Sequence, residues 1–463
     1  MTGSELIQLG YTSGKWFGAA LQHINDNALE GDALMAYLES IKPAPMLPLH
    51  ETAPVYHVNI KAENEVEADN ILKVRETMDL LMQTPTVVGG VIMPDACPAG
   101  PVGTIPVGGV VAAYKAIHPG MHSADICCSV MLTNFGKTDP KAVLDAAHSI
   151  THFGPVFRSE DNIFTMPDEL VDEFRANPLL NNQKMLSVAK KHLGTQGDGN
   201  HFLYVGVSKK TGDTMLVTHH GSRGVGANLY DTGMAIAERF RKEISEDTKP
   251  MNAWIPSDSP EGEMYWDALQ TTRKWTHLNH EVLHQKTCDL LEVVHTDRYW
   301  NEHNFVFREG DTFYHAKGAT PLTANFMPET HTKRIIPLNM CQPILIVEGD
   351  TTATNLGFAP HGAGRNISRS AHKRLHAPGK TVRQIFDEET AGYDVRFFTK
   401  SIDISELPSA YKDAEQVKAQ IEDFGLAAIT DEIMPYGCIM AGDCARTKPW
   451  KNKRKAVEAV VEQ

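Results

Sequence analysis

Apolar residues recur at helical spacing in several parts of the chain. In one segment they follow the three-and-four spacing of a single helix face: Ile71, Val74, Met78 and Leu81. Acidic residues between positions 63 and 69 precede this face, as suits a helix N-terminus. Three further segments predict helices: residues 182–193, residues 228–245 and residues 261–294, the last as one long helix or two joined ones.

Short runs rich in β-branched and aromatic residues lie between these segments. They predict strands at residues 105–114, 202–207, 215–219, 304–307 and 344–347. Strands and helices do not alternate strictly, so we expect a mixed α+β fold rather than a doubly wound parallel sheet. No repeat, low-complexity tract or long linker divides the chain. We therefore expect one large domain, with helices around mixed sheets.

The composition is typical of a water-soluble globular protein, with 42% hydrophobic and 22% charged residues among 463. The chain has no run of about 18 apolar residues, and its start lacks the basic-then-apolar layout of a signal peptide. Seven cysteines in so long a chain do not make a disulfide framework. These features predict a reducing, cytoplasmic location and no membrane partner.

The net charge of −14 argues weakly against a nucleic-acid partner, although net charge describes only the far field. The C-terminal segment 443–463 differs, since basic residues surround Trp450 there: Arg446, Lys448, Lys451, Lys453, Arg454 and Lys455. An aromatic ring among basic side chains suits stacking on a nucleobase. Two interpretations of this extension stay open: it is a frayed and solvated tail, or it is a segment that binds RNA.

Two adjacent cysteines, Cys127 and Cys128, follow Asp125 in an otherwise apolar run. Neighbouring cysteines suit a disulfide poorly, because bridging them strains the geometry that a disulfide requires. We interpret Cys127 as a small buried hydrophobe. Asp125 and Cys128 lie three residues apart, close enough for a carboxylate and a thiolate to point at one centre.

Histidines and glycines meet in four polar stretches beside predicted strands: "GTQGDGNHF" (194–202), "VTHHGSRGVG" (217–226), "NEHNFVFREG" (301–310) and "APHGAGRNISRS" (359–370). Each histidine taken alone is more simply a structural residue. Together, one Asp, one Cys and three His are enough ligands for two divalent metals, with the thiolate as a bridge. Ions such as Mn²⁺, Co²⁺, Ni²⁺ or Zn²⁺ accept this mixture of ligands. Two such ions about 3.5–4 Å apart suit displacement at phosphorus.

Eight short motifs occur in order between about Met93 and Tyr411: "MPDACPAGPVGTIPVGGVVA", "DICCSVM", "GTQGDGNHF", "HHGSRG", "HNF", "KGATP", "HGAGRNISRS" and "PSAYKD". This combination resembles the RNA-splicing ligase family RtcB. The resemblance implies a ligase domain over residues 1–442 with a central dinuclear metal cleft. It implies an enzyme that joins RNA 2′,3′-cyclic phosphate or 3′-phosphate ends to 5′-hydroxyl ends, with two Mn²⁺ ions and GTP. Nothing in the sequence demands an oligomer, so we expect a monomer.

The same resemblance implies roles for single residues. Asp125 and His201 would hold one metal, His219 and His303 the other, with Cys128 as the bridge. His361 would be the nucleophile, which takes GMP from GTP as a phosphoramidate and passes it to the RNA 3′-phosphate. The residues implied in nucleotide or phosphate binding are Asn200, Asn304, Gly362, Ala363, Gly364, Arg365 and Tyr411, together with Asp350, Asn355, Tyr204 and Met440 at positions that differ from the family pattern.

Several positions depart from the family pattern. Tyr204 stands where the family has a Glu that reads guanine, and Met440 where it has a Lys that also contacts the base. Because Tyr204 cannot accept the two hydrogen bonds that a carboxylate takes from guanine, we predict that GTP is favoured only modestly over ATP. The other departures are Asp350 and Asn355 at former serine positions of a loop, Cys97 for a His, and Cys127 for a Gly.

Two other functions stay open from the sequence. One is a metal-dependent phosphodiesterase that only opens cyclic phosphates; Tyr204 and Met440 favour it, and His361 in its Gly-Ala-Gly setting opposes it. The other is a non-catalytic binder of RNA ends that uses metals as phosphate anchors. Five intact ligands together with a nucleophile oppose this last interpretation.

Overall fold

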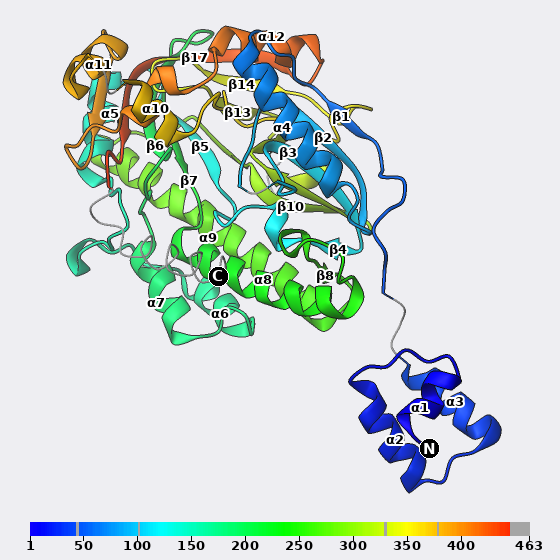
Figure 1. Ribbon diagram of the computed structural model, residues 1–463. Helices are drawn as coiled ribbons and strands as arrows, with labels where there is room; N and C mark the ends of the chain where they lie inside the picture. Colours follow the sequence, from blue (N-terminus) through cyan, green and yellow to red (C-terminus); the bar gives the residue numbers. More distant parts are fainter. Residues whose placement is uncertain (43–45, 101, 328–330, 377–378, 445–463) are drawn as a thin grey trace.

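The computed structural model describes residues 1–42, 46–100, 102–327, 331–376 and 379–444 (Figure 1). Helices and strands are mixed along this chain without strict alternation, which confirms the predicted α+β class. Within these ranges no helix is both long and apolar enough to cross a bilayer. The basic residues around Trp450 lie outside the described residues, so the role of the extension and the boundary at residue 442 stay predictions.

Two large sheets form the body of the protein. The five-stranded sheet has the order β1 (Tyr56–Val58), β2 (Val87–Cys97), β3 (Val107–Tyr114), β11 (Thr312–Lys317), β10 (Asn304–Glu309). The eight-stranded sheet has the order β13 (Arg334–Pro337), β14 (Ile344–Glu348), β17 (Ala428–Met440), β6 (Phe202–Ser208), β7 (Thr214–His220), β5 (Ser129–Asn134), β9 (Asp297–Glu302), with β16 (Asp394–Phe397) beside β17. Two small sheets pair β12 (Ala319–Pro321) with β15 (Phe358–Pro360), and β4 (Ala116–Ile117) with β8 (Ile255–Pro256).

The register of the eight-stranded sheet brings four strand ends to one edge. Strand β5 is antiparallel to both β7 and β9, so that Ser129 lies opposite His220 and Glu302. Strand β6 is antiparallel to β7, with Phe202 opposite His219. The beginnings of β5 and β6 therefore lie beside the ends of β7 and β9. One residue, His303, separates β9 from β10 and so joins the two large sheets at this edge.

The helices predicted from periodicity are present: α4 (Glu65–Leu81), α7 (Gln183–His192), α8 (Arg223–Ile244) and α9 (Pro260–Leu291). The Asn64 side chain caps α4 by accepting from the Glu67 N–H, and Asn182 caps α7 in the same way. Helix α9 is continuous. Helix α8 begins earlier than predicted, because the Ser222 carbonyl accepts from the N–H groups of residues 225 and 226 despite the glycines there.

All the predicted strands are present, as β3, β6, β7, β10 and β14. The remaining helices are α1 (Gly3–Gln8), α2 (Trp16–Asp26), α3 (Gly31–Ile41), α5 (Pro140–Ile150), α6 (Asp168–Ala176), α10 (Arg369–His376), α11 (Val382–Glu389) and α12 (Ala414–Asp423). Helices α1–α3, which we did not predict, pack around a core of their own and lie apart from the body in Figure 1.

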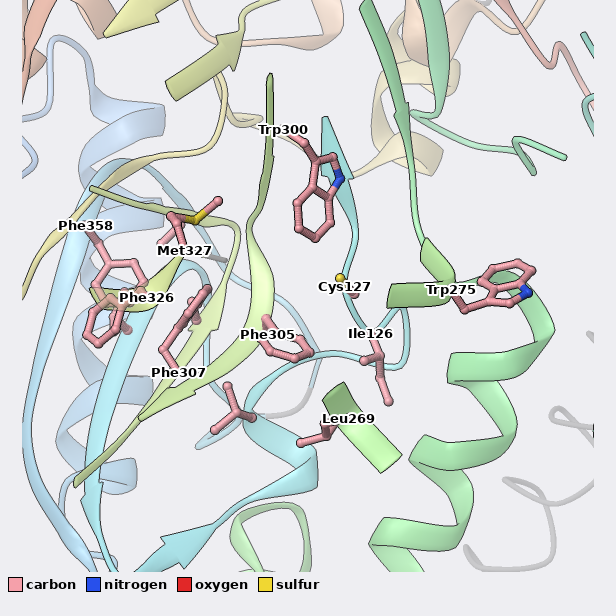
Figure 2. Packing of buried hydrophobic residues seen from close by; sticks show 14 of the residues in the cluster. Ile126, Cys127, Leu269, Trp275, Trp300, Phe305, Phe307, Phe326, Met327 and Phe358 are labelled. Carbon is pink, nitrogen blue, oxygen red and sulfur yellow. The ribbon is translucent and has the colours of Figure 1, made fainter. Parts of the chain in front are cut away.

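Cys127 belongs to a hydrophobic core that it shares with Ile126, Trp300 and Phe305 (Figure 2). Its side chain is fully buried, which confirms the interpretation as a small buried hydrophobe. The backbone φ of Cys127 is +59°, in the left-handed region that favours glycine. This conformation accounts for the glycine of the family pattern at this position.

Candidate metal and nucleotide site

A cavity of about 660 Å³ lies where the two large sheets meet. Most of the predicted site residues line it: Asp125, Cys128, Asn200, Tyr204, His219, His303, Asn304, His361, Gly362, Ala363, Gly364, Arg365, Tyr411 and Met440. His201 lies just behind this wall and is 6% exposed. Residues that are far apart in the sequence are therefore gathered around one space.

Five metal-ligating side chains form one continuous cluster. The Cys128 Sγ lies 3.5 Å from His201 Nε2 and 3.2 Å from His219 Nε2. The Nε2 atoms of His219 and His303 lie 3.2 Å apart, and His201 Nε2 lies 3.0 Å from an Asp125 carboxylate oxygen. The strand register explains the convergence, because four of these residues occupy the strand ends at one sheet edge.

Backbone carbonyls fix two of these imidazoles. The His201 Nδ1–H donates to the Gln196 carbonyl at 2.6 Å, and the His219 Nδ1–H donates to the Asn200 carbonyl at 3.1 Å. In the neutral ring of His219, Nε2 then carries the lone pair and points into the cluster. A lone pair of His219 thus faces His303, an arrangement that a cation between the rings would satisfy. The residues present fit a site for borderline divalent metals.

Burial favours the neutral forms of His219 and Cys128, whereas Asp125 is held in its ionised form. Burial lowers the pKa of His219 to about 3, and the nearby charges of His201 and His361 act in the same direction. Burial raises the pKa of the Cys128 thiol far above its usual value, and the Asp125 charge adds to this effect. Burial opposes ionisation of Asp125 as well, but the hydrogen bond and charge of His201 hold its pKa below the usual value. A divalent cation bound here would favour the thiolate.

His361 is oriented by a carboxylate that we did not predict as a site residue, Asp95 on β2. The His361 Nδ1–H donates to an Asp95 oxygen at 2.5 Å, and the His361 backbone N–H donates to the same oxygen at 3.0 Å. Asp95 is fully buried. These bonds leave Nε2 of the neutral ring unprotonated, and the ring centroid lies 4.9 Å from that of His303. The geometry therefore presents an imidazole nitrogen with a lone pair beside the Asp/Cys/His cluster.

The turn that carries His361 lies directly against β2. Gly364 has φ +74°, and a β-carbon there would collide with the Asp95 carbonyl oxygen. On the other side of this contact, Lys412 donates from Nζ to the carbonyls of Pro94 and Ala96 at 2.9 and 3.0 Å. The backbone N–H of Lys412 donates to the Gly364 carbonyl. The His361 turn, β2 and the "PSAYKD" segment are thus held as one unit.

A buried carboxylate, Glu406, organises the cationic wall of the cavity. It accepts from Arg365 Nη1 at 3.4 Å, from Arg369 Nε at 2.5 Å and from the Tyr411 hydroxyl at 2.5 Å. The Arg365 guanidinium also lies over the Tyr411 ring at 5.1 Å. With two guanidinium groups for one carboxylate, this wall keeps a net positive charge that suits phosphate groups.

The two amide side chains that we predicted at the site, Asn200 and Asn304, both line the cavity. Part of the hydrogen-bonding capacity of Asn304 is already used within the protein. The Asn304 Oδ1 accepts from the Gly318 N–H at 2.8 Å. The loop residues Asp350 and Asn355 are not among the residues that line this cavity. Asn355 is fully buried, and its amide closes its own loop through the N–H groups of residues 352 and 357. Their predicted role in nucleotide binding therefore lacks support from the geometry.

The family model described as tRNA-splicing ligase RtcB matches residues 157–441, more than half of the chain. The chain belongs to the RtcB family. The tRNA-splicing ligase RtcB of Aeropyrum pernix is 29% identical over 58% of this chain and 64% of its own length. That of Nanoarchaeum equitans is 26% identical over 54% of this chain and 60% of its own length. The chain thus spans less than two thirds of the length of these relatives.

The residues matched by the RtcB family model begin after Asp95, Asp125 and Cys128. The fold, and not this match, therefore places these three residues at the site. Two charged residues of the cavity wall, Lys317 and Glu406, escaped the prediction, as did Asp95, which contacts His361 from outside this wall. Asp95 and Lys317 lie within quoted motifs, "MPDAC" and "KGATP", and Glu406 lies just before "PSAYKD". A charged residue inside an apolar motif was the available signal. Burial lowers the pKa of Lys317 to about 8, and its Nζ donates to the Ile105 carbonyl.

Proposed function

We propose that this protein is a GTP- and Mn²⁺-dependent RNA ligase that joins RNA 2′,3′-cyclic phosphate or 3′-phosphate ends to 5′-hydroxyl ends. Membership of the RtcB family supports the ligase class, and the names of its relatives refer to tRNA splicing. One observation carries the proposal: the Asp/Cys/His cluster and the carboxylate-bound His361 share a single cavity. A metal-anchored binder of RNA ends would not require a nucleophile oriented in this way.

His361 would attack the α-phosphate of GTP through Nε2. A P–N bond forms, the bond to pyrophosphate breaks, and a nucleotidyl-histidine results. Asp95 accepts the Nδ1–H and stabilises the positive charge that develops on the ring during attack. The RNA 3′-phosphate then displaces His361 and takes GMP, and the 5′-hydroxyl displaces GMP in turn. A cyclic phosphate is first hydrolysed to a 3′-phosphate.

The other residues of the cavity bind and neutralise phosphate groups. Two Mn²⁺ ions on Asp125, Cys128 and the three clustered histidines would supply Lewis acidity at the phosphate oxygens. Arg365 presents its guanidinium to the same cavity and would offset charge on the transferred group. Asn200 and Asn304 line the same cavity and would donate from Nδ2 to phosphate oxygens, although Asn304 Nδ2 also donates to the Asp125 carbonyl at 3.5 Å.

The proposal includes a cytoplasmic monomer. Six cysteines are free thiols, in keeping with a reducing compartment: Cys97, Cys127, Cys128, Cys288, Cys341 and Cys438. Burial also raises the pKa of Cys127, so this thiol stays protonated and unreactive.

The test uses purified full-length protein loaded with Mn²⁺, GTP labelled at the α-phosphate, and an RNA pair with 2′,3′-cyclic phosphate and 5′-hydroxyl ends. We expect an acid-labile, alkali-stable protein label and a ligated product. His361→Ala should lower both by about 10⁴-fold or more, as removal of a nucleophile does. RNA that ends in a 3′-hydroxyl serves as the matched control and should not be joined. Opened cyclic phosphate without label or ligated product would instead favour the phosphodiesterase.

A further inference from the structure

Four apolar side chains form a continuous floor at one end of the cavity. Phe202 and Tyr204 lie on β6, and Cys438 and Met440 lie on β17; in each strand the two residues share a face because they are two positions apart. Phe202 is directly opposite Met440, and Tyr204 is directly opposite Cys438. All four line the cavity, and Met340 and Ile344 extend the same apolar surface. We call these four residues the apolar floor.

The apolar floor begins next to the metal-ligating cluster. Phe202 lies opposite His219 on its other side, and the two ring centroids are 5.2 Å apart. His219, Phe202 and Met440 thus form one row across three neighbouring strands. A nucleotide whose α-phosphate lies at the cluster beside His361 would therefore extend its base over this floor.

The apolar floor offers no group that reads the edge of a base. Tyr204 is 1% exposed, and its hydroxyl donates to the Ile433 carbonyl at 2.8 Å, away from any ligand. Phe202, Cys438 and Met440 carry no hydrogen-bonding group stronger than a thiol. Stacking and apolar contact are available to any purine, because every base has an apolar face.

Two hydrogen-bond acceptors elsewhere in the cavity wall are already engaged, the Glu406 carboxylate and the Asn339 Oδ1. The Glu406 carboxylate accepts from Arg365, Arg369 and Tyr411. The Asn339 Oδ1 accepts from the Cys341 N–H at 3.0 Å. Guanine presents two adjacent donors, N1–H and N2–H, that a free carboxylate would accept. Within the described lining of the cavity, no such carboxylate is left uncommitted beside the floor.

We infer that the apolar floor binds the purine of the nucleoside triphosphate by packing alone, so that ATP serves as well as GTP in nucleotidylation of His361. This inference rests on the proposed function. Strong discrimination between ligands of equal shape requires a hydrogen-bonding group that the wrong ligand leaves unpaired. A hydrogen bond contributes about 1 kcal/mol net, so without such groups the two triphosphates should differ by less than about tenfold.

The first experiment measures how ATP and GTP, each labelled at the α-phosphate, label His361 in the Mn²⁺-loaded protein over a range of concentrations. We expect second-order labelling rates within about tenfold of one another. The variant Met440→Lys adds a donor that guanine O6 accepts and adenine N6 does not, and it should shift the ratio several-fold toward GTP. A GTP preference of several hundredfold in the unaltered protein would overturn the inference and leave the proposed function intact.

A second measurement does not depend on turnover. His361→Ala cannot be labelled, so calorimetry on this variant gives the affinities for ATP and GTP directly. Affinities within about tenfold support the inference, and a larger preference for either purine contradicts it. If neither nucleotide labels the unaltered protein, the proposed function fails, while the calorimetric ratio still decides the present inference.

Discussion

The two ends of the cavity are built from neighbouring strands but from opposite chemistry. At one end each side chain is fixed by a polar contact, as with His219 on the Asn200 carbonyl and His361 on Asp95. At the other end Phe202 and Met440 belong to a hydrophobic cluster, although the Phe202 ring also lies beside His219. For phosphoryl transfer, the polar side chains of a site have to be held in position within fractions of an ångström. In our proposal separate residues, those of the apolar floor, bind the base, so base preference can change without any change in the reacting groups.

The strongest test of this contrast is at the polar end, where two adjacent cysteines have opposite surroundings. Cys128→Ala removes the thiol that contacts His201 and His219. We expect loss of Mn²⁺ affinity by more than about 100-fold, because even residues behind the ligands account for 10–100-fold. Metal content after dialysis and the labelling rate are the measurements.

Cys127→Ala is the matched control for this change. Cys127 lies in the hydrophobic core and not in the cavity wall, so metal content should be retained. Only the free energy of unfolding should fall, by about 1 kcal/mol. Equal metal loss in the two variants would show that the cluster does not hold the metal through Cys128.

A smaller effect is expected from Asp95→Asn. The amide keeps the shape of the side chain but removes the negative charge that stabilises the His361 ring during attack. We expect the labelling rate to fall by about 100-fold, within the range for an oriented acid–base partner. Metal content should not change, because Asp95 contacts His361 and not the cluster. Unchanged labelling would mean that Asp95 serves only the packing of β2.

The smallest expected effect is at the apolar end, in Tyr204→Phe. The hydroxyl that is lost donates to Ile433 and does not face the cavity. The free energy of unfolding should fall by about 1 kcal/mol because a buried carbonyl loses its donor. The ratio of ATP to GTP labelling should stay the same. A changed ratio would show that the Tyr204 hydroxyl reaches the base. The apolar end would then also use a polar contact, contrary to the comparison made here between the two ends.

Local signals in the sequence were enough for the elements with the clearest patterns, four helices and five strands, but not for the others. Helices α4 and α7 could be predicted because an Asn cap and an apolar stripe lie within a few residues of each other. The start of α8 was missed because glycine propensity is a weak prior that hydrogen bonds around Ser222 override. The pairing of β17 with β6, which builds the apolar floor, joins segments more than 200 residues apart and left no local trace.

The candidate site was predictable in its residue types and less so in its contacts. The metal-ligating side chains and His361 stood out because histidines clustered with glycines in short motifs. Asp95 did not, since only the packing of β2 against the His361 turn gives it a partner. Asp350 and Asn355 were assigned by position in a loop, and the structure uses Asn355 to close that loop instead. Sequence shows which groups are present, whereas long-range packing decides which of them meet.

The distance along the chain between Cys128, His201 and His303 has a thermodynamic consequence. These residues meet only when β5, β6, β7 and β9 are paired, so an unfolded chain offers a cation no comparable site. A ligand that binds only the folded state stabilises it, by about 2.7 kcal/mol at a concentration 100 times its Kd. Divalent ions bound at this cluster would therefore also shift the folding equilibrium, and a chelator would lower the melting temperature of the metal-loaded protein.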